Sequence, residues 1–210
     1  MSDVVLYDLA LSPNNIKVRI ALNYKEIPFE RIDIPADDDR ARVVEVSGQP
    51  LTPVIRHGGA VVVDSAAIMR YLEANFPDTP RILFTDRPTM MEANQLERWI
   101  FTNINGPVGT VFGQFMSDTP DAAVCEQAEA QLHENTADFE SRLEGQDFLM
   151  GDTMSFVDIT AAPFVSYGMV PEQLAARHPA GRFFHEHMSL GADRERTRGW
   201  CARVMAYDRP

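Results

Sequence analysis

The sequence predicts an α/β domain with the element order βαβ–ββα, followed by an all-helical domain. Short apolar runs and one helical segment alternate in the first third of the 210-residue chain, and only helical periodicity follows. Between the two regions, residues 77–88 are rich in proline and aspartate, which suits a linker. The predicted domains are therefore residues 1–79 and 89–210, joined by a linker at 80–88.

The βαβ part of the first domain is predicted from its hydrophobic pattern. Residues 4–7 form a short apolar run, typical of a strand, and 16–24 have helical spacing. In the strand expected at 29–34, Ile32 and Ile34 share a face. The acidic run at 37–39 and the residues after it indicate a solvated helix or loop.

A proline opens the next strand. Thr52-Pro53 precedes Val54 and Ile55, and Gly58-Gly59 then forms a turn to a second apolar strand. A cis X-Pro bond costs only about 0.5–1 kcal/mol. A cis Pro53 would turn the main chain of Thr52 outward with an unpaired N–H and C=O, where an extended peptide could pair. The alternative is an ordinary trans proline at the start of a strand.

Asp64 and Ser65 stand where the following helix begins. Either side chain can cap that helix, whose apolar residues recur at helical spacing: Ile68, Tyr71, Leu72 and Phe76. The free N–H groups of a first helical turn attract a carboxylate, while Asp64 can hold an ammonium group. The alternative is that both residues only cap the helix.

The second domain is predicted to be helical throughout. Gly106-Pro107 should kink its first helix, because proline removes a helical hydrogen bond and clashes with the preceding turn. Ser155 and Asp158 form a capping box at the start of another. The expected helices cover residues 89–116, 122–143 and 155–165, with a last one that contains Trp200, Val204 and Met205.

Composition excludes several classes of protein. The net charge of −12 would repel a phosphate backbone, so we expect no nucleic-acid partner. No apolar run reaches the roughly 20 residues that cross a membrane, and the first residues lack the features of a signal peptide, which predicts a cytoplasmic protein. Cys125 and Cys201 are expected to be buried thiols. His185 and His187 are expected on the surface, and no metal site is indicated.

Taken together, these motifs resemble those of the cytosolic glutathione transferase superfamily. Within that superfamily, the chain resembles a serine-type bacterial member. The resemblance rests on Ser12-Pro13, Thr52-Pro53-Val54, Asp64-Ser65 and the box from Ser155 to Asp158. It implies a thioredoxin-like domain followed by a helical one, glutathione as co-substrate, a homodimer and a role in detoxification.

The resemblance assigns the glutathione contacts position by position. The main chain of Thr52, before a cis Pro53, would pair with the cysteinyl unit, and Asp64 and Ser65 would hold the γ-glutamyl end. Where the family often has Gln or Lys, two residues before this proline, the chain has Leu51, and Gln49 lies further back.

The resemblance also places Ser12 at the position of the activating hydroxyl. A hydroxyl donor and the positive end of a helix both favour a thiolate, which lowers the pKa of a thiol from its usual value near 8.5. The alternative is that Ser12 only caps the helix that Pro13 begins. Tyr7 is the rival for the catalytic role, and Asn14 could add an amide donor near the sulfur.

Transfer chemistry is expected rather than disulfide exchange, because Ser12 replaces the cysteine that exchange would need. The acceptor would be a small hydrophobic electrophile in a pocket between the domains. The candidate lining residues are Ile104, Val108 and Phe112, with Phe101 and Phe115 as further candidates.

Two alternatives stay open. One is a non-catalytic relative of the stringent starvation protein type, which keeps the fold and binds a partner protein. The other is a zeta-type isomerase acting on maleyl compounds, which resembles this chain in its serine and in the run from Val18 to Leu22. The extra Ser and Cys of that isomerase motif are replaced here by Pro13 and Asn14.

Overall fold

The structure is a computed structural model and describes residues 3–209. The chain divides into two compact units. Among the described residues, one unit comprises 3–85 together with 206–209, and the other is Asp86–Met205. The residues from Ala206 thus pack with the first unit, whereas the sequence assigned them to the helical domain.

The first unit contains a four-stranded sheet in the order β2-β1-β3-β4. β1 (Val4–Asp8) is parallel to β2 (Phe29–Asp33) and antiparallel to β3 (Val54–His57), which pairs with β4 (Ala60–Val63). Gly58, between β3 and β4, has φ of +56°, a conformation that glycine adopts without strain. The thioredoxin-like prediction is confirmed.

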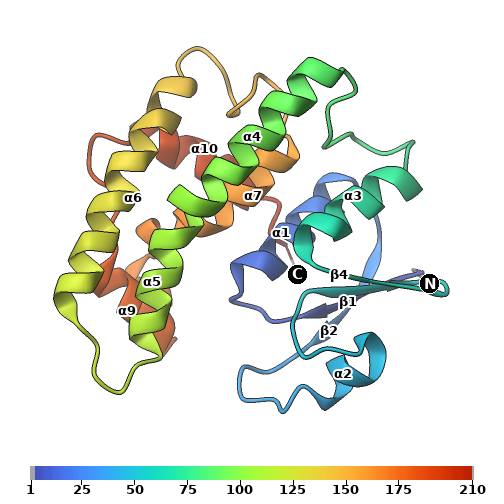
Figure 1. The fold of residues 1–210 in the computed structure, drawn as a ribbon, viewed down its shortest axis with the longest axis horizontal. Helices are drawn as coiled ribbons and strands as arrows, with labels where there is room; N and C mark the ends of the chain where they lie inside the picture. Colours follow the sequence, from blue (N-terminus) through green and yellow to red (C-terminus); the bar gives the residue numbers. More distant parts are fainter. Residues whose placement is uncertain (1–2, 210) are drawn as a thin grey trace. The chain divides into compact units, whose positions relative to one another are not determined.

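Helices cover both faces of this sheet (Figure 1). α1 (Pro13–Tyr24) and α3 (Ser65–Asn75) lie on one face, and α2 (Ala41–Ser47) lies on the other. Val43 of α2 is fully buried, in a cluster with Val5, Tyr7, Ile34 and Val54. Ile32 packs against this cluster, so the expectation that Ile32 and Ile34 share a face is confirmed.

A buried ionic cluster fixes the end of β1. Asp8 is fully buried, and Arg19 Nη1 donates hydrogen bonds of 2.7 Å to both of its carboxylate oxygens. Arg31 Nε lies 2.8 Å from the same carboxylate. Arg19 also binds Asp208, with 2.6 Å between Nε and Oδ1, which ties the C-terminal residues to α1. Burial raises the pKa of Asp8, although the two guanidinium groups oppose that shift.

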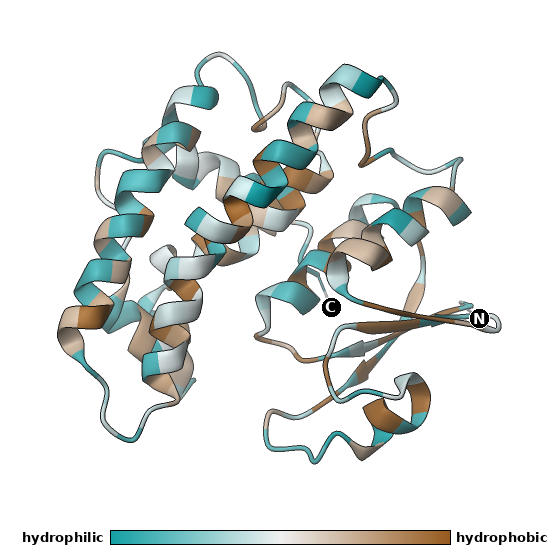
Figure 2. Cartoon of the chain, viewed as in Figure 1, coloured by the Kyte–Doolittle hydropathy of each residue, from teal (hydrophilic) through white to brown (hydrophobic). Residues whose placement is uncertain are grey.

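The second unit is helical, as predicted, with one isolated β-bridge between Phe148 and Gly151. Its helix α6 (Ala122–Arg142) is largely hydrophilic, whereas hydrophobic colour runs along the strands of the first unit (Figure 2). Its α-helices are α4 (Arg87–Asn103), α5 (Asn105–Phe115), α6 (Ala122–Arg142), α7 (Phe156–Val165), α8 (Glu172–Ala175), α9 (Pro179–His187) and α10 (Glu195–Met205), and the 3-10 helix η1 (Ser166–Met169) follows α7.

The helix expected at residues 89–116 is two helices. α4 ends before Ile104 and α5 begins after it, so the break precedes the Gly106-Pro107 pair that the sequence indicated. Pro107 has no N–H to donate to the carbonyl of Asn103, four residues earlier. The side-chain amide of Asn135 in α6 donates to that carbonyl instead, at 2.8 Å.

The predicted capping box begins α7. Asp158 is fully buried and its carboxylate accepts from the main chain and the hydroxyl of Ser155, at 2.9 and 2.8 Å. Leu149 N and Trp200 Nε1 donate to its other oxygen, each at 2.8 Å. This carboxylate thus joins three segments of the helical unit. Burial raises its pKa, and the four donors act in the opposite direction.

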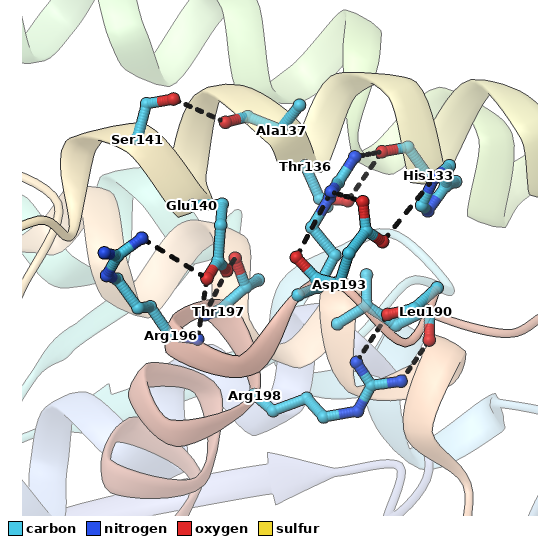
Figure 3. Close-up of polar contacts among 12 residues, drawn as sticks. His133, Thr136, Ala137, Glu140, Ser141, Leu190, Asp193, Arg196, Thr197 and Arg198 are labelled. Carbon is cyan, nitrogen blue, oxygen red and sulfur yellow. Dashed lines mark hydrogen bonds and ion pairs between the residues drawn. The ribbon is translucent and has the colours of Figure 1, made fainter.

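A second carboxylate links α6 to α10 (Figure 3). Glu140 accepts from the main-chain N–H groups of Arg196 and Thr197 at 3.0 and 2.9 Å, and from the Thr197 hydroxyl at 2.9 Å. Because these N–H groups belong to the first turn of α10, they have no partner within that helix. Glu140 therefore caps α10 from a neighbouring helix.

Residues 171–197, for which the sequence offered no landmark, contain α8, α9 and the start of α10. Within residues 3–209, no helix is both long and apolar enough to cross a membrane. Cys125 and Cys201 are buried free thiols, as expected. His185 is exposed near the end of α9.

Candidate functional site

Ser12 lies at the N-terminus of α1 and does not cap it with its side chain. The residue is extended, with φ −76° and ψ 124°, and Pro13 follows at the first helical position. Its carbonyl accepts from Asn15 N and Ile16 N, both at 2.9 Å, while its half-buried hydroxyl makes no cap hydrogen bond. This hydroxyl can therefore donate to a group outside the helix.

Thr52 lies just before β3, joined to Pro53 by a cis peptide bond. Residues 3–209 include no main-chain or side-chain partner for the N–H and C=O of Thr52. Thr52 is half-buried. The N–H and C=O of one residue are the two groups with which an extended peptide pairs when it is added to a strand.

Gln49 holds the loop that leads to Thr52. Its side-chain oxygen accepts from Leu51 N at 2.7 Å, and its nitrogen donates to Leu51 O at 2.8 Å and to the Ser47 hydroxyl at 3.1 Å. The Leu51 side chain is 72% exposed. Gln49 thus acts on the main chain of this loop, and its amide is already occupied.

Asn15, which the sequence analysis did not select, joins the surroundings of Ser12 to Thr52. It is fully buried in α1. Its Oδ1 accepts from Leu9 N and its Nδ2 donates to Thr52 Oγ1, each at 3.1 Å. The signal was an asparagine at helical spacing with Val18 and Leu22, on the buried face of the helix.

Asp64 and Ser65 begin α3. Asp64 is the N-cap, with Oδ1 accepting from Ala67 N at 2.9 Å. Its φ of 72° lies in the left-handed region, which costs a non-glycine residue about 1–3 kcal/mol. Asp64 is exposed and Ser65 is buried at the first position of α3. The second carboxylate oxygen of Asp64 can thus bind an ammonium group, and the first N–H groups of α3 can bind a carboxylate.

Tyr7 lies in the core of the sheet. Asp8 faces α1 through Arg19, and successive strand residues point to opposite faces, so Tyr7 faces α2. The residue is 3% exposed, and the guanidinium of Arg42 lies 6.0 Å from the centre of its ring. Tyr7 therefore lies on the face opposite α1.

Asn14 is exposed beside Ser12 in the first turn of α1. Its Oδ1 accepts from Lys17 Nζ at 3.0 Å. This hydrogen bond orients the amide and leaves its NH₂ group as the donor end. The proposed amide donor toward a sulfur stays a prediction.

The candidate acceptor residues lie in the helical unit. Ile104, between α4 and α5, and Val108 are buried, whereas Phe112 is 50% exposed and packs against Phe115 with 6.0 Å between ring centres. Their role in an acceptor pocket stays a prediction. The same unit has a cavity of about 330 Å³ between α5 and α9, whose walls include Phe115, Phe183, Arg177 and Arg182.

Two family models match the chain. The model described as "Glutathione S-transferase, N-terminal domain" matches residues 6–80, and "Glutathione S-transferase, C-terminal domain" matches 104–189. The chain belongs to the cytosolic glutathione transferase superfamily. The sequence-based prediction of a glutathione transferase is confirmed at the level of the family.

Curated relatives cover most of the transferase chain at low identity. Glutathione S-transferase U14 of Arabidopsis thaliana is 24% identical over 93% of this chain and 78% of its own length. Glutathione S-transferase F10 of the same plant is 27% identical over 72% of this chain and 75% of its own. FtsZ-localized protein A of Caulobacter vibrioides is 25% identical over 79% of each chain.

Solved structures show the same fold. Poplar glutathione transferase F1 superposes with a TM-score of 0.73 at 20% identity, over 96% of this chain and 91% of that one. A Tau class glutathione S-transferase from mango, Mangifera indica, gives a TM-score of 0.76 at 18% identity, over 97% and 88%. The glutathione transferase fold predicted from the sequence is confirmed.

Proposed function

We propose that this chain is a glutathione S-transferase that activates the thiol of glutathione for attack on a small hydrophobic electrophile. The observation that carries the proposal is the Ser12 hydroxyl at the start of α1, which makes no cap bond to its own helix. A serine in this position commonly caps the helix, so an unengaged hydroxyl there is available to a ligand.

The tripeptide would bind along two features of the first unit. Its cysteinyl unit pairs with the main-chain N–H and C=O of Thr52, which residues 3–209 leave without a partner. Its γ-glutamyl carboxylate meets the N-terminus of α3 at Ser65, and its ammonium meets the second oxygen of Asp64.

The chemical step is thiol activation. Ser12 donates a hydrogen bond to the sulfur and keeps its own proton, while the N-terminus of α1 adds partial positive charge. Both favour the thiolate, so the thiol proton leaves to solvent near neutral pH. The thiolate then forms a bond to the electrophilic carbon, and the leaving group departs with the electron pair of the broken bond.

A homodimer is part of the same proposal, because closed two-fold dimers are the commonest soluble oligomers. We also predict that the protein lies in the cytoplasm and has no nucleic-acid partner. The identity of the electrophile depends on the shape of the acceptor pocket.

Calorimetric titration with glutathione tests the proposal, with Ser12→Ala and Ser65→Ala alongside and conjugation measured on a generic aryl halide. We expect Ser65→Ala to abolish the binding heat, and Ser12→Ala to keep it while conjugation falls about 10–100-fold. Binding heat with no conjugation in the wild type would contradict the transfer reaction.

A partner-binding function is the second candidate. One relative of similar coverage, FtsZ-localized protein A, is named for localisation with another protein rather than for transfer. This candidate predicts that glutathione leaves the melting temperature unchanged, whereas a ligand selective for the folded state raises it. The zeta-type isomerase stays an alternative for the reaction, tested by turnover of maleyl compounds.

A further inference from the structure

Asn15 is a buried amide whose two ends bind two segments that the proposed reaction uses. We infer that Asn15 is a positioning residue, which sets the Ser12 hydroxyl relative to the main-chain edge of Thr52. The inference rests on the proposed function, because it concerns how the sulfur is presented to Ser12.

One end of Asn15 closes a ring of hydrogen bonds around the turn that carries Ser12. Leu9 N donates to Asn15 Oδ1 at 3.1 Å, Ser12 N donates to Leu9 O at 2.9 Å, and Asn15 N donates to Ser12 O at 2.9 Å. The turn from Leu9 to Ser12 is thus held at both ends by one residue. Both the side chain and the main chain of Asn15 are therefore bonded to this turn.

The other end of Asn15 reaches across the fold. Its Nδ2 donates to the hydroxyl oxygen of Thr52 at 3.1 Å, over 37 residues of sequence. The proposed peptide edge is the main chain of this same threonine. Because Asn15 is fully buried, loss of either hydrogen bond leaves a buried polar atom of its amide without its partner.

This arrangement matters for activation more than for affinity. A donor must be held within about 0.5 Å of its productive position, and a 1 Å displacement can cost about 100-fold in rate. The γ-glutamyl contacts at Asp64 and Ser65 do not involve Asn15. Loss of the Asn15–Thr52 bond therefore weakens the Ser12-to-sulfur contact while most of the binding contacts remain.

Thr52→Val tests the inference with a small change, because it removes the accepting oxygen and keeps the shape of the side chain. We expect the apparent pKa of the bound thiol to rise, kcat to fall about 10-fold and the glutathione Kd to change less than about 3-fold. Thr52→Ser restores the oxygen and is expected to bring the thiol pKa back. The ultraviolet absorbance of the bound thiolate, followed against pH, reads out that pKa.

Asn23→Ala is the matched control in the same helix. Asn23 Nδ2 donates to Tyr207 O at 3.0 Å and so binds the C-terminal residues instead of Thr52. We expect this variant to lower the Tm and leave the thiol pKa unchanged. The comparison separates a positioning role from a general loss of stability.

The outcomes separate the inference from the proposed function. If Thr52→Val and Thr52→Ser give the same thiol pKa, or if Asn23→Ala shifts it equally, the inference is overturned and the proposed function stands. If the wild type neither binds nor conjugates glutathione, the proposed function fails and the inference falls with it. The inference is supported if the pKa of the bound thiol shifts in Thr52→Val and in neither Thr52→Ser nor Asn23→Ala.

Discussion

The side-chain amide of Asn135 takes the place of the N–H that Pro107 lacks, donating to the main-chain carbonyl of Asn103 at 2.8 Å. This hydrogen bond joins α6 to the end of α4, at the point where α4 is followed by α5. A broken helix otherwise leaves a carbonyl without a partner, at a cost of about 1–3 kcal/mol where the group is buried.

Asn135→Ala should lower the free energy of unfolding by about 1–2 kcal/mol, because it leaves the Asn103 carbonyl unsatisfied. Pro107→Ala supplies an N–H that can bond to this carbonyl, so the loss from Asn135→Ala should shrink in the Pro107→Ala background. A double-mutant cycle in urea measures this coupling. Strictly additive effects would contradict the assignment.

Glu140→Gln should change the response of stability to acid. Burial raises the pKa of Glu140, but the bonds from Thr197 and Arg196 outweigh it and hold the pKa below the ordinary value of 4.5. The ionised carboxylate therefore contributes stability above pH 4.5, and this contribution is lost as pH falls through the folded-state pKa. The glutamine variant should lose about 1 kcal/mol near neutral pH and show a weaker acid dependence.

Denaturant unfolding at several pH values measures this difference. Asp8 and Asp158 have raised pKa values, so they act with the opposite sign and favour the folded state as pH falls toward 3.8. The wild type and the Glu140→Gln variant both contain Asp8 and Asp158. The difference between their free energies of unfolding therefore isolates the contribution of Glu140. A difference that stays constant down to pH 3 would argue against the cap.

Arg19→Leu should be strongly destabilising, because it leaves the fully buried Asp8 carboxylate with Arg31 as its only cationic partner among residues 3–209. Breaking a buried ion pair from one side costs about 3–5 kcal/mol. Asp208→Asn is the control: Asp208 is 21% exposed, and its loss should cost about 1 kcal/mol or less. Equal losses in the free energy of unfolding, measured in urea, would show that the Arg19–Asp208 pair contributes as much as the Arg19–Asp8 pair.

Gln49→Ala should weaken glutathione binding. The variant removes both bonds to the main chain of Leu51, so the loop before Thr52 gains freedom that binding must then remove. We expect the glutathione Kd to rise about 3–10-fold with a small loss in Tm. Leu51→Ala, which removes an exposed side chain and keeps the loop bonds, should bind like the wild type in calorimetry.

The sequence alone predicted the two-part architecture and selected most residues of the candidate site. Periodicity separated the sheet-containing region from the helices, and the box from Ser155 to Asp158 located the start of α7 because capping is a local interaction. Ser12, Thr52 and Asp64 stood out for the same reason: a helix start or a strand entry is visible in neighbouring residues.

Only the tertiary structure decided which of these positions are joined and how. Asn15 meets Thr52 across 37 residues, Glu140 caps α10 from α6, and Asp208 returns to Arg19. Whether Ser12 caps its helix or leaves its hydroxyl unengaged also depends on side-chain geometry. Such contacts join residues far apart in the chain, and one sequence holds no local signal for a partner that folding brings near.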